Sequence, residues 1–153
     1  MIDTQTFLLR AAVAVILGGI IGIDREIKRK PLGLRAYMLV SLGAAAVCMM
    51  SINMAAKAEV DGLAFDLSRA VQGIVGGIGF LGAGAIISRN ETGRLRGVAS
   101  GSAIWLVGVV GIGVGFGLLI ESAVIAIAAT LILTVVAEAR NGSDFDKGTS
   151  PDT

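Results

Sequence analysis

Residues 97–137 read GVASGSAIWLVGVVGIGVGFGLLIESAVIAIAATLILTVVA, and Glu121 is the only charged residue in this stretch of 41. As one helix the stretch would be about 60 Å long, roughly twice the apolar thickness of a bilayer. The chain must therefore fold back within it. Alternating glycines occupy residues 111–117 and are poor residues for a helix interior, so we expect the turn there. Glu121 then lies in the first turn of the last helix, where the helix dipole favours an anion.

Three further uncharged runs precede this stretch, at residues 11–23, 36–56 and 70–88. A helix that crosses a bilayer needs roughly 20 apolar residues, and a small soluble domain has no room for so many runs of this length. We therefore predict an all-α, polytopic transmembrane helix bundle. Its five spans are expected at about residues 5–23, 36–56, 69–88, 98–114 and 117–137.

The composition excludes several classes of protein. Hydrophobic residues make up 54% of the chain and charged residues 16%, with a net charge of +1, so neither a disordered chain nor an ordinary nucleic-acid binder fits. The chain has no histidine and a single cysteine, Cys48, which excludes a disulfide framework, a Cys/His zinc site and catalysis by imidazole. We expect a protein that is not an enzyme, binds no nucleic acid and has no cofactor, with Mg²⁺ left open.

The basic residues predict the orientation in the membrane. With five spans, the loop after the first span, the loop after the third and the C-terminal tail all lie on one side. Together they carry 10 of the 13 lysines and arginines, so this side is expected to be the cytoplasm and the N-terminus to face outward. No basic segment precedes the first apolar run, so we expect no cleavable signal peptide. Residues 1–137 then form the membrane domain, and the polar residues 138–153 form a disordered cytoplasmic tail.

Small residues predict which helix faces pack together, because helices in lipid associate through close backbone contact. In the first span, Gly18 and Gly22 share a stripe. In the third span, at about 100° per residue, one face carries Gly73, Gly77 and Gly84, and another carries Gly79 and Gly82. We expect this helix to be sandwiched between neighbours as the packing hub of the bundle. The alternative is a broken or re-entrant segment that lines a site, as in transporters.

The loop after the first span holds charges in unfavourable positions. Asp24 ends the first span, where the helix dipole disfavours an anion, and Arg35 begins the second, where it disfavours a cation. We expect Asp24 to pair with Arg35 or with Arg25 at the membrane boundary. The alternative is anchoring to lipid phosphates, which is sufficient for Lys28, Arg29 and Lys30.

Charges inside the predicted spans are few. Arg10 lies within the first span, where its side chain either reaches the interface or is buried in a specific contact. No carboxylate lies at the centre of any predicted span, whereas a Mg²⁺ path normally needs carboxylates or retained waters. A single chain is therefore poorly equipped for Mg²⁺ transport, and a pore lined by backbone carbonyls in an oligomer is left open.

Three blocks of sequence together resemble one family. Residues 19–26, GIIGIDRE, with residues 30–35, KPLGLR, are similar to the first signature of the MgtC/SapB membrane proteins. Residues 76–84, GGIGFLGAG, are similar to the second signature, and residues 96–117 look like the third. The resemblance covers about residues 19–117.

The resemblance implies a bacterial inner-membrane protein of about five helices, linked to growth in low magnesium and, in pathogens, to survival inside macrophages. A regulatory role on other membrane proteins is the more usual view of the family than direct transport. By the same motifs, the candidate functional residues are Asp24, Arg25, Glu26, Pro31, Gly33, Arg35, Gly77, Gly79, Gly82 and Gly84. The chain departs from the family at residues 97–102, where threonines are typical. We expect a short member without the soluble C-terminal domain of longer members.

Two functions are compatible with these observations. The first is a non-enzymatic membrane protein that binds another membrane component or forms a homo-oligomer, with the cytoplasmic face around Asp24 and Arg35 as its working surface. The second is a transporter or channel for Mg²⁺ or another small solute. It draws on the glycine-rich third span, and it requires an ion path that the residues of the spans do not supply. The lipid bilayer is a partner in both.

Overall fold

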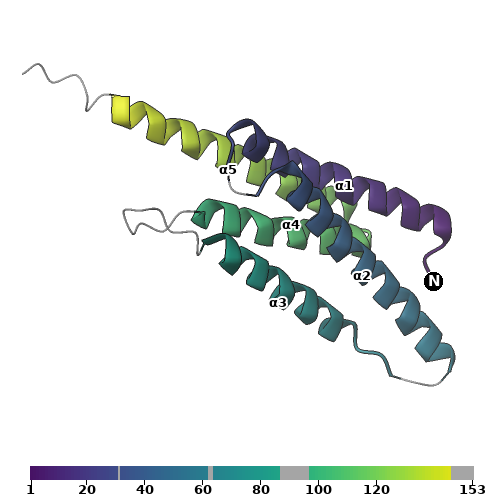
Figure 1. Cartoon of the computed structure of the whole chain (residues 1–153). Coiled ribbons are helices and arrows are strands. Elements are labelled where there is room, and N and C mark those ends of the chain that lie inside the picture. Colours follow the sequence, from purple (N-terminus) through teal and green to yellow (C-terminus); the bar gives the residue numbers. More distant parts are fainter. Residues whose placement is uncertain (31, 62–63, 87–96, 146–153) are drawn as a thin grey trace, which may run out of the picture.

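The computed structural model describes residues 1–30, 32–61, 64–86 and 97–145, and over residues 136–145 it describes the helix without its side chains. The described chain folds into five α-helices that form one bundle (Figure 1). They are α1 (Thr4–Ile27), α2 (Leu34–Val60), α3 (Leu67–Ile86), α4 (Val98–Phe116) and α5 (Leu119–Phe145). The predicted all-α class is therefore confirmed.

The helix lengths agree with a chain that crosses a membrane several times. Helices α1 to α4 are each long and apolar enough to span, and the apolar part of α5 is Leu119–Val135. Helix α5 continues to Phe145, so residues 138–145, expected in a disordered tail, are helical. Alanine, glutamate and arginine at residues 137–140 are good helix formers, and they extend a helix that is already nucleated. Residues 146–153 lie outside the described residues.

The turn between the last two helices is shorter than predicted. Gly111, Gly113 and Gly115 are all helical residues of α4. Only Gly117 leaves the helix, with a φ of +88° that favours glycine, and its backbone N–H donates to the carbonyl of Val114 at 2.9 Å. The expectation that the alternating glycines break the helix is wrong, because these glycines serve close helix–helix contacts instead.

Helix α4 forms the centre of the bundle. It contacts each of the other four helices, and Figure 1 shows it between α3 and the remaining helices. Along it Ile104, Val107, Val110 and Val114 are fully buried. Helix α3, which was expected to be the hub, lies at the edge of the bundle and buries only Ile78 and Gly82. Within this chain the packing hub is therefore α4.

The glycines of α4 let its neighbours approach closely. A Cβ on Gly115 would lie 2.6 Å from the Cβ of Cys48 on α2, and a Cβ on Gly101 would lie 2.7 Å from the carbonyl oxygen of Gly82 on α3. A Cβ on Gly111 would collide with the backbone carbonyl of Ser41 on α2. No side chain fits at these positions, so the backbones themselves form the interfaces.

Helices α1 and α2 meet in the same manner. A Cβ on Gly18 would lie 2.8 Å from the Cβ of Ser41, and a Cβ on Gly22 would lie 3.0 Å from the Cβ of Tyr37. Both glycines are buried. The small-residue stripe of α1 therefore faces α2, and the two helices lie side by side along the bundle (Figure 1).

The N-terminus is fixed at the end of the bundle where α1 begins. The carboxylate of Asp3 accepts a hydrogen bond from the backbone N–H of Thr6 at 2.7 Å and caps α1, and this bond lowers the pKa of the carboxyl group. The side-chain amide of Asn53 accepts from the backbone N–H of Ile2 at 2.6 Å and donates to its carbonyl at 3.3 Å. This pair explains a polar residue within α2.

Arg10 closes the same end of the bundle. Its Nη1 donates to the carbonyl oxygen of Gly115 at 2.8 Å, at the C-terminus of α4, where the helix dipole favours a cation. A Cβ on Gly117 would lie 2.6 Å from the Arg10 Nη2. Of the two alternatives for Arg10, the structure shows the specific contact.

Replacing Arg10 with Leu is therefore expected to destabilise the bundle by about 1–3 kcal/mol, because the Gly115 carbonyl loses a charged donor in a partly buried place. The measurement is thermal unfolding of the purified protein in detergent, with Arg10→Lys as the control that keeps the charge. An unfolding midpoint for Arg10→Leu equal to that of the wild type would contradict the role of this contact.

Candidate functional site

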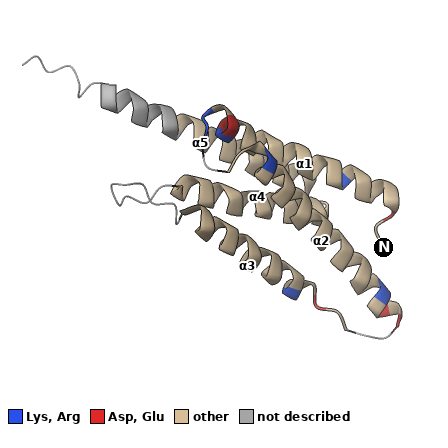
Figure 2. Cartoon of the chain, viewed as in Figure 1, with Lys and Arg blue, Asp and Glu red and all other residues tan. Residues whose placement is uncertain are grey.

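The first predicted motif lies where α1 ends and α2 begins. Charged residues gather at this end of α1 (Figure 2). Asp24 and Arg25 are almost fully buried, with 6% and 3% of their surface exposed. We call Asp24, Arg25 and Lys28 the charged cluster. Burial of two adjacent charges is costly unless they are paired, so their partners define what the cluster does.

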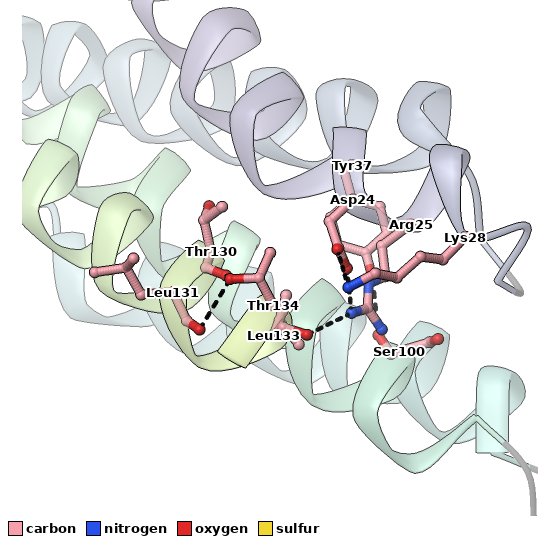
Figure 3. Close-up of polar contacts among 9 residues, drawn as sticks. All are labelled: Asp24, Arg25, Lys28, Tyr37, Ser100, Thr130, Leu131, Leu133 and Thr134. Carbon is pink, nitrogen blue, oxygen red and sulfur yellow. Dashed lines mark hydrogen bonds and ion pairs between the residues drawn. The ribbon is translucent and has the colours of Figure 1, made fainter. Parts of the chain in front are cut away.

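The cluster is held by two ion pairs and a contact to α5. The Arg25 Nη2 lies 2.5 Å from the Asp24 Oδ2, and the Lys28 Nζ lies 2.5 Å from the Asp24 Oδ1. The same Arg25 nitrogen also donates to the carbonyl of Leu133 on α5 at 3.4 Å (Figure 3). Two cations near the C-terminus of α1 thus compensate an anion that the helix dipole disfavours.

A hydrogen bond between α2 and α4 lies beside the cluster. The Tyr37 hydroxyl, which is fully buried, donates to the carbonyl of Ser100 in the first turn of α4 at 3.3 Å (Figure 3). Tyr37 also packs against Gly22, two residues before Asp24 on α1. The cluster and this bond together link α1, α2, α4 and α5 at one end of the bundle.

Of the two expected partners of Asp24, the structure shows Arg25. Arg35 is exposed and makes no ion pair with a described residue. Lys28, which was assigned to lipid anchoring, pairs with Asp24 instead. Its position was available from the sequence, because residues four apart on a helix face each other. Tyr37 and Leu133 were not predicted, since nothing in the local sequence places α2 or α5 beside this turn.

Glu26 has a different role from the cluster, because its carboxylate caps α2. The Glu26 Oε2 accepts a hydrogen bond from the backbone N–H of Leu34 at 2.9 Å. The N-cap residue of α2 is Gly33, which has no side chain to satisfy that donor. A Cβ on Gly33 would collide with the Glu26 carboxylate, although the Gly33 φ of −79° suits any residue. A side chain at Gly33 would therefore displace the Glu26 carboxylate from its place at α2. Pro31 lies outside the described residues.

Replacing Gly33 with Ala is expected to displace the Glu26 carboxylate from α2 and to lower stability by about 1 kcal/mol. The control is Gly43→Ala on the same helix, where a Cβ has nothing within 4 Å. That change is expected to be neutral or to stabilise by up to about 1 kcal/mol. Thermal unfolding in detergent compares the two, and equal midpoints would contradict the proposed crowding at Gly33.

The glycine block of α3 is separate from this site. Helix α3 is continuous from Leu67 to Ile86, so the alternative of a broken segment is not found. Gly82 faces α4, with a Cβ position 3.1 Å from the carbonyl oxygen of Gly101. At the other predicted positions a Cβ would meet no atom of the described chain within 4 Å; they are Gly73, Gly77, Gly79 and Gly84.

The long apolar helices, with a charged cluster buried at one end, define a multi-pass helical membrane protein. The chain belongs to the MgtC family, whose family model matches residues 11–141. The similarity therefore covers all of the motifs described above.

Several named relatives share most of this chain. YhiD of Escherichia coli K12 is 33% identical over 75% of the chain and 53% of its own length. SrpB of Synechococcus elongatus is 36% identical over 71% of the chain and 63% of its own length. MgtC of Brucella abortus is 35% identical over 74% of the chain and 44% of its own length. The chain thus spans about half the length of these relatives. Among solved structures, none matches it.

Proposed function

We propose that this chain is a non-enzymatic protein of the bacterial inner membrane that supports adaptation to low magnesium by binding and regulating another membrane component. Family membership supports the link to magnesium, since the name of the relative YhiD contains the words magnesium transporter. The motif end of the bundle, where α1 meets α2, faces the cytoplasm in this proposal, because it carries Arg29, Lys30 and Arg35.

The observation that carries the proposal is the packing around α4. Its fully buried valines and Ile104 occupy the middle of the bundle, and its glycines hold α2 and α3 in backbone contact. Hydrated Mg²⁺ gives up its water reluctantly and needs oxygen ligands along its path. A centre filled with aliphatic side chains favours a protein that binds through its surface over one that conducts an ion.

The working surface is assigned to the exposed charges beside the buried cluster. The residues of the charged cluster hold helices together, so we assign them a role in stability and not in direct contact with a partner. Arg35 stands in the first turn of α2, is exposed, and makes no ion pair with a described residue. The Arg35 cation therefore makes no ion pair that stabilises the described fold, and the dipole of α2 disfavours a cation at this end of the helix. Such a cation is suited to bind an acidic group of a partner.

Growth in low magnesium tests this assignment. A strain that lacks its own copy of the gene is complemented with wild type, Arg35→Ala or Lys57→Ala. Both variants remove one exposed cation from α2, at opposite ends of the helix, and neither is expected to change stability by more than about 0.5 kcal/mol. We expect growth to fail with Arg35→Ala alone, at equal protein levels. Full growth with Arg35→Ala would overturn the assignment.

The second candidate function is transport of Mg²⁺, which the name of YhiD favours. It predicts uptake of Mg²⁺ by the purified protein without any partner. The two candidates therefore predict different results for Mg²⁺ uptake into liposomes that contain only this protein.

A further inference from the structure

The glycines of α3 differ from most glycines of α1 and α4. On α1 and α4, a Cβ at Gly18, Gly22, Gly101, Gly108, Gly111, Gly113 or Gly115 would come within 3.0 Å of a neighbouring helix. On α3, five of the six glycines face open space, and Gly82 alone meets another helix. Glycine weakens a helix by roughly 1 kcal/mol relative to alanine. At these seven positions on α1 and α4 close contact offsets that cost. Gly43 on α2 has no such contact, and α3 collects five glycines for which the described chain supplies none.

The outward side of α3 is also not uniformly apolar. At about 100° per residue, one side of the helix collects a set of exposed residues, which we call the α3 outer face. Its members are Arg69, Gln72, Gly73, Gly76, Gly77, Phe80, Ala83 and Gly84. Gln72 is exposed within a helix long and apolar enough to span, and Phe80 is 81% exposed. An amide facing lipid lacks a hydrogen-bond partner, and this observation is independent of the glycines.

The chemistry of this face is complementary to itself. Asp66 and Arg69 are both exposed where α3 begins, and the Asp66 Oδ2 lies 3.9 Å from the Arg69 Nε. The other carboxylate oxygen of Asp66 accepts hydrogen bonds from the backbone N–H and the hydroxyl of Ser68. When two copies lie side by side about a two-fold axis, Asp66 of each copy can pair with Arg69 of the other. The Gln72 amide both donates and accepts, so two copies also satisfy each other. One occupant, a second copy of this chain, meets both requirements.

The shape is complementary as well. Copies in one membrane share one orientation, so two α3 helices related by a two-fold axis run parallel. A helical side chain leans toward the N-terminus of its helix. Phe80 of one copy therefore reaches over the level of Gly76 and Gly77 of the other, where no side chain blocks it.

We propose that the α3 outer face binds the same face of a second copy, so that two chains pair through parallel α3 helices. This inference goes beyond the proposed function and does not depend on it. The pairing uses the edge of the bundle, and the motif end around Arg35 stays free for another partner.

The decisive variants are Gly77→Leu and Gly43→Leu. Both glycines are exposed, and a Cβ at either one meets nothing within 4 Å, so neither change disturbs the fold of the single chain. Association is measured by energy transfer between labelled copies diluted in lipid vesicles. Gly77→Leu is expected to weaken it by roughly tenfold or more, and Gly43→Leu is expected to leave it unchanged. Gln72→Leu is expected to weaken it by roughly three- to tenfold.

Disulfide cross-linking locates the contact. In a Cys48→Ala background, cysteines at residues 73, 76 and 84 are expected to form dimers on oxidation, and cysteines at the lipid-exposed Ile16 and Leu131 are not. Equal association of Gly77→Leu and wild type would overturn the proposal, as would cross-linking of α3 only to a different protein. The proposed function is tested by growth in low magnesium, and the pairing of α3 helices is tested by association and cross-linking. A negative result for one therefore leaves the other standing.

Discussion

Replacing Asp24 with Asn is expected to destabilise the bundle by about 3–5 kcal/mol, because Arg25 then lies buried without a counter-charge. Lys28 loses its partner too, although its partly exposed side chain can turn to water. The measurement is the unfolding midpoint in detergent, with Arg35→Ala as the exposed control that should match the wild type.

A double variant separates pairing from simple loss of packing. Asp24→Asn together with Arg25→Gln removes both buried charges, so it is expected to be less destabilised than the sum of the two single variants. Additive losses, or an Asp24→Asn midpoint equal to that of the wild type, would contradict the buried ion pair. A functional defect of Asp24→Asn alone therefore says little about binding.

Replacing Gly111 with Leu is expected to cost about 3 kcal/mol or more, because even a Cβ at this position collides with the backbone carbonyl of Ser41. Helices α2 and α4 must then separate at the centre of the bundle. The measurements are folded yield and thermal unfolding after purification in detergent.

Gly77→Leu is the matched control for this change, since a Cβ at Gly77 has no atom of the described chain within 4 Å. This variant is expected to fold as well as the wild type, while its association with a second copy weakens. If Gly111→Leu were as stable as Gly77→Leu, α4 would not be the close-packed centre of the bundle.

The fold could be predicted because charge is so strongly excluded from the bilayer. The uncharged runs indicated the five helices, and their predicted limits agree within a few residues with α1 to α4. The meaning of the glycines could not be predicted in the same way. The run of glycines at residues 111–117 resembles a turn, yet most of it forms helix that backbones of other helices approach.

Of the local contacts of the site, the pair of Asp24 with Arg25 was predicted. The pair of Asp24 with Lys28, which lie one helical turn apart, was missed because Lys28 was interpreted as a lipid anchor. The bonds from Arg10 to Gly115 and from Arg25 to Leu133 join residues 105 and 108 positions apart. Such distant partners depend on which helices pack together and on which faces, and this packing could not be predicted from a single sequence. The outward position of the α3 glycines was missed for the same reason.

We propose that this chain acts by binding another membrane component and does not itself carry Mg²⁺. The most direct test is uptake of Mg²⁺ into sealed liposomes that contain the purified wild-type protein and an internal Mg²⁺ indicator. As a control for folding, the unfolding temperature of the reconstituted protein is measured on samples taken before and after the assay. The two temperatures must be equal. We expect uptake equal to that of empty liposomes. Saturable uptake of Mg²⁺ above that level would overturn the proposed function and establish a transporter.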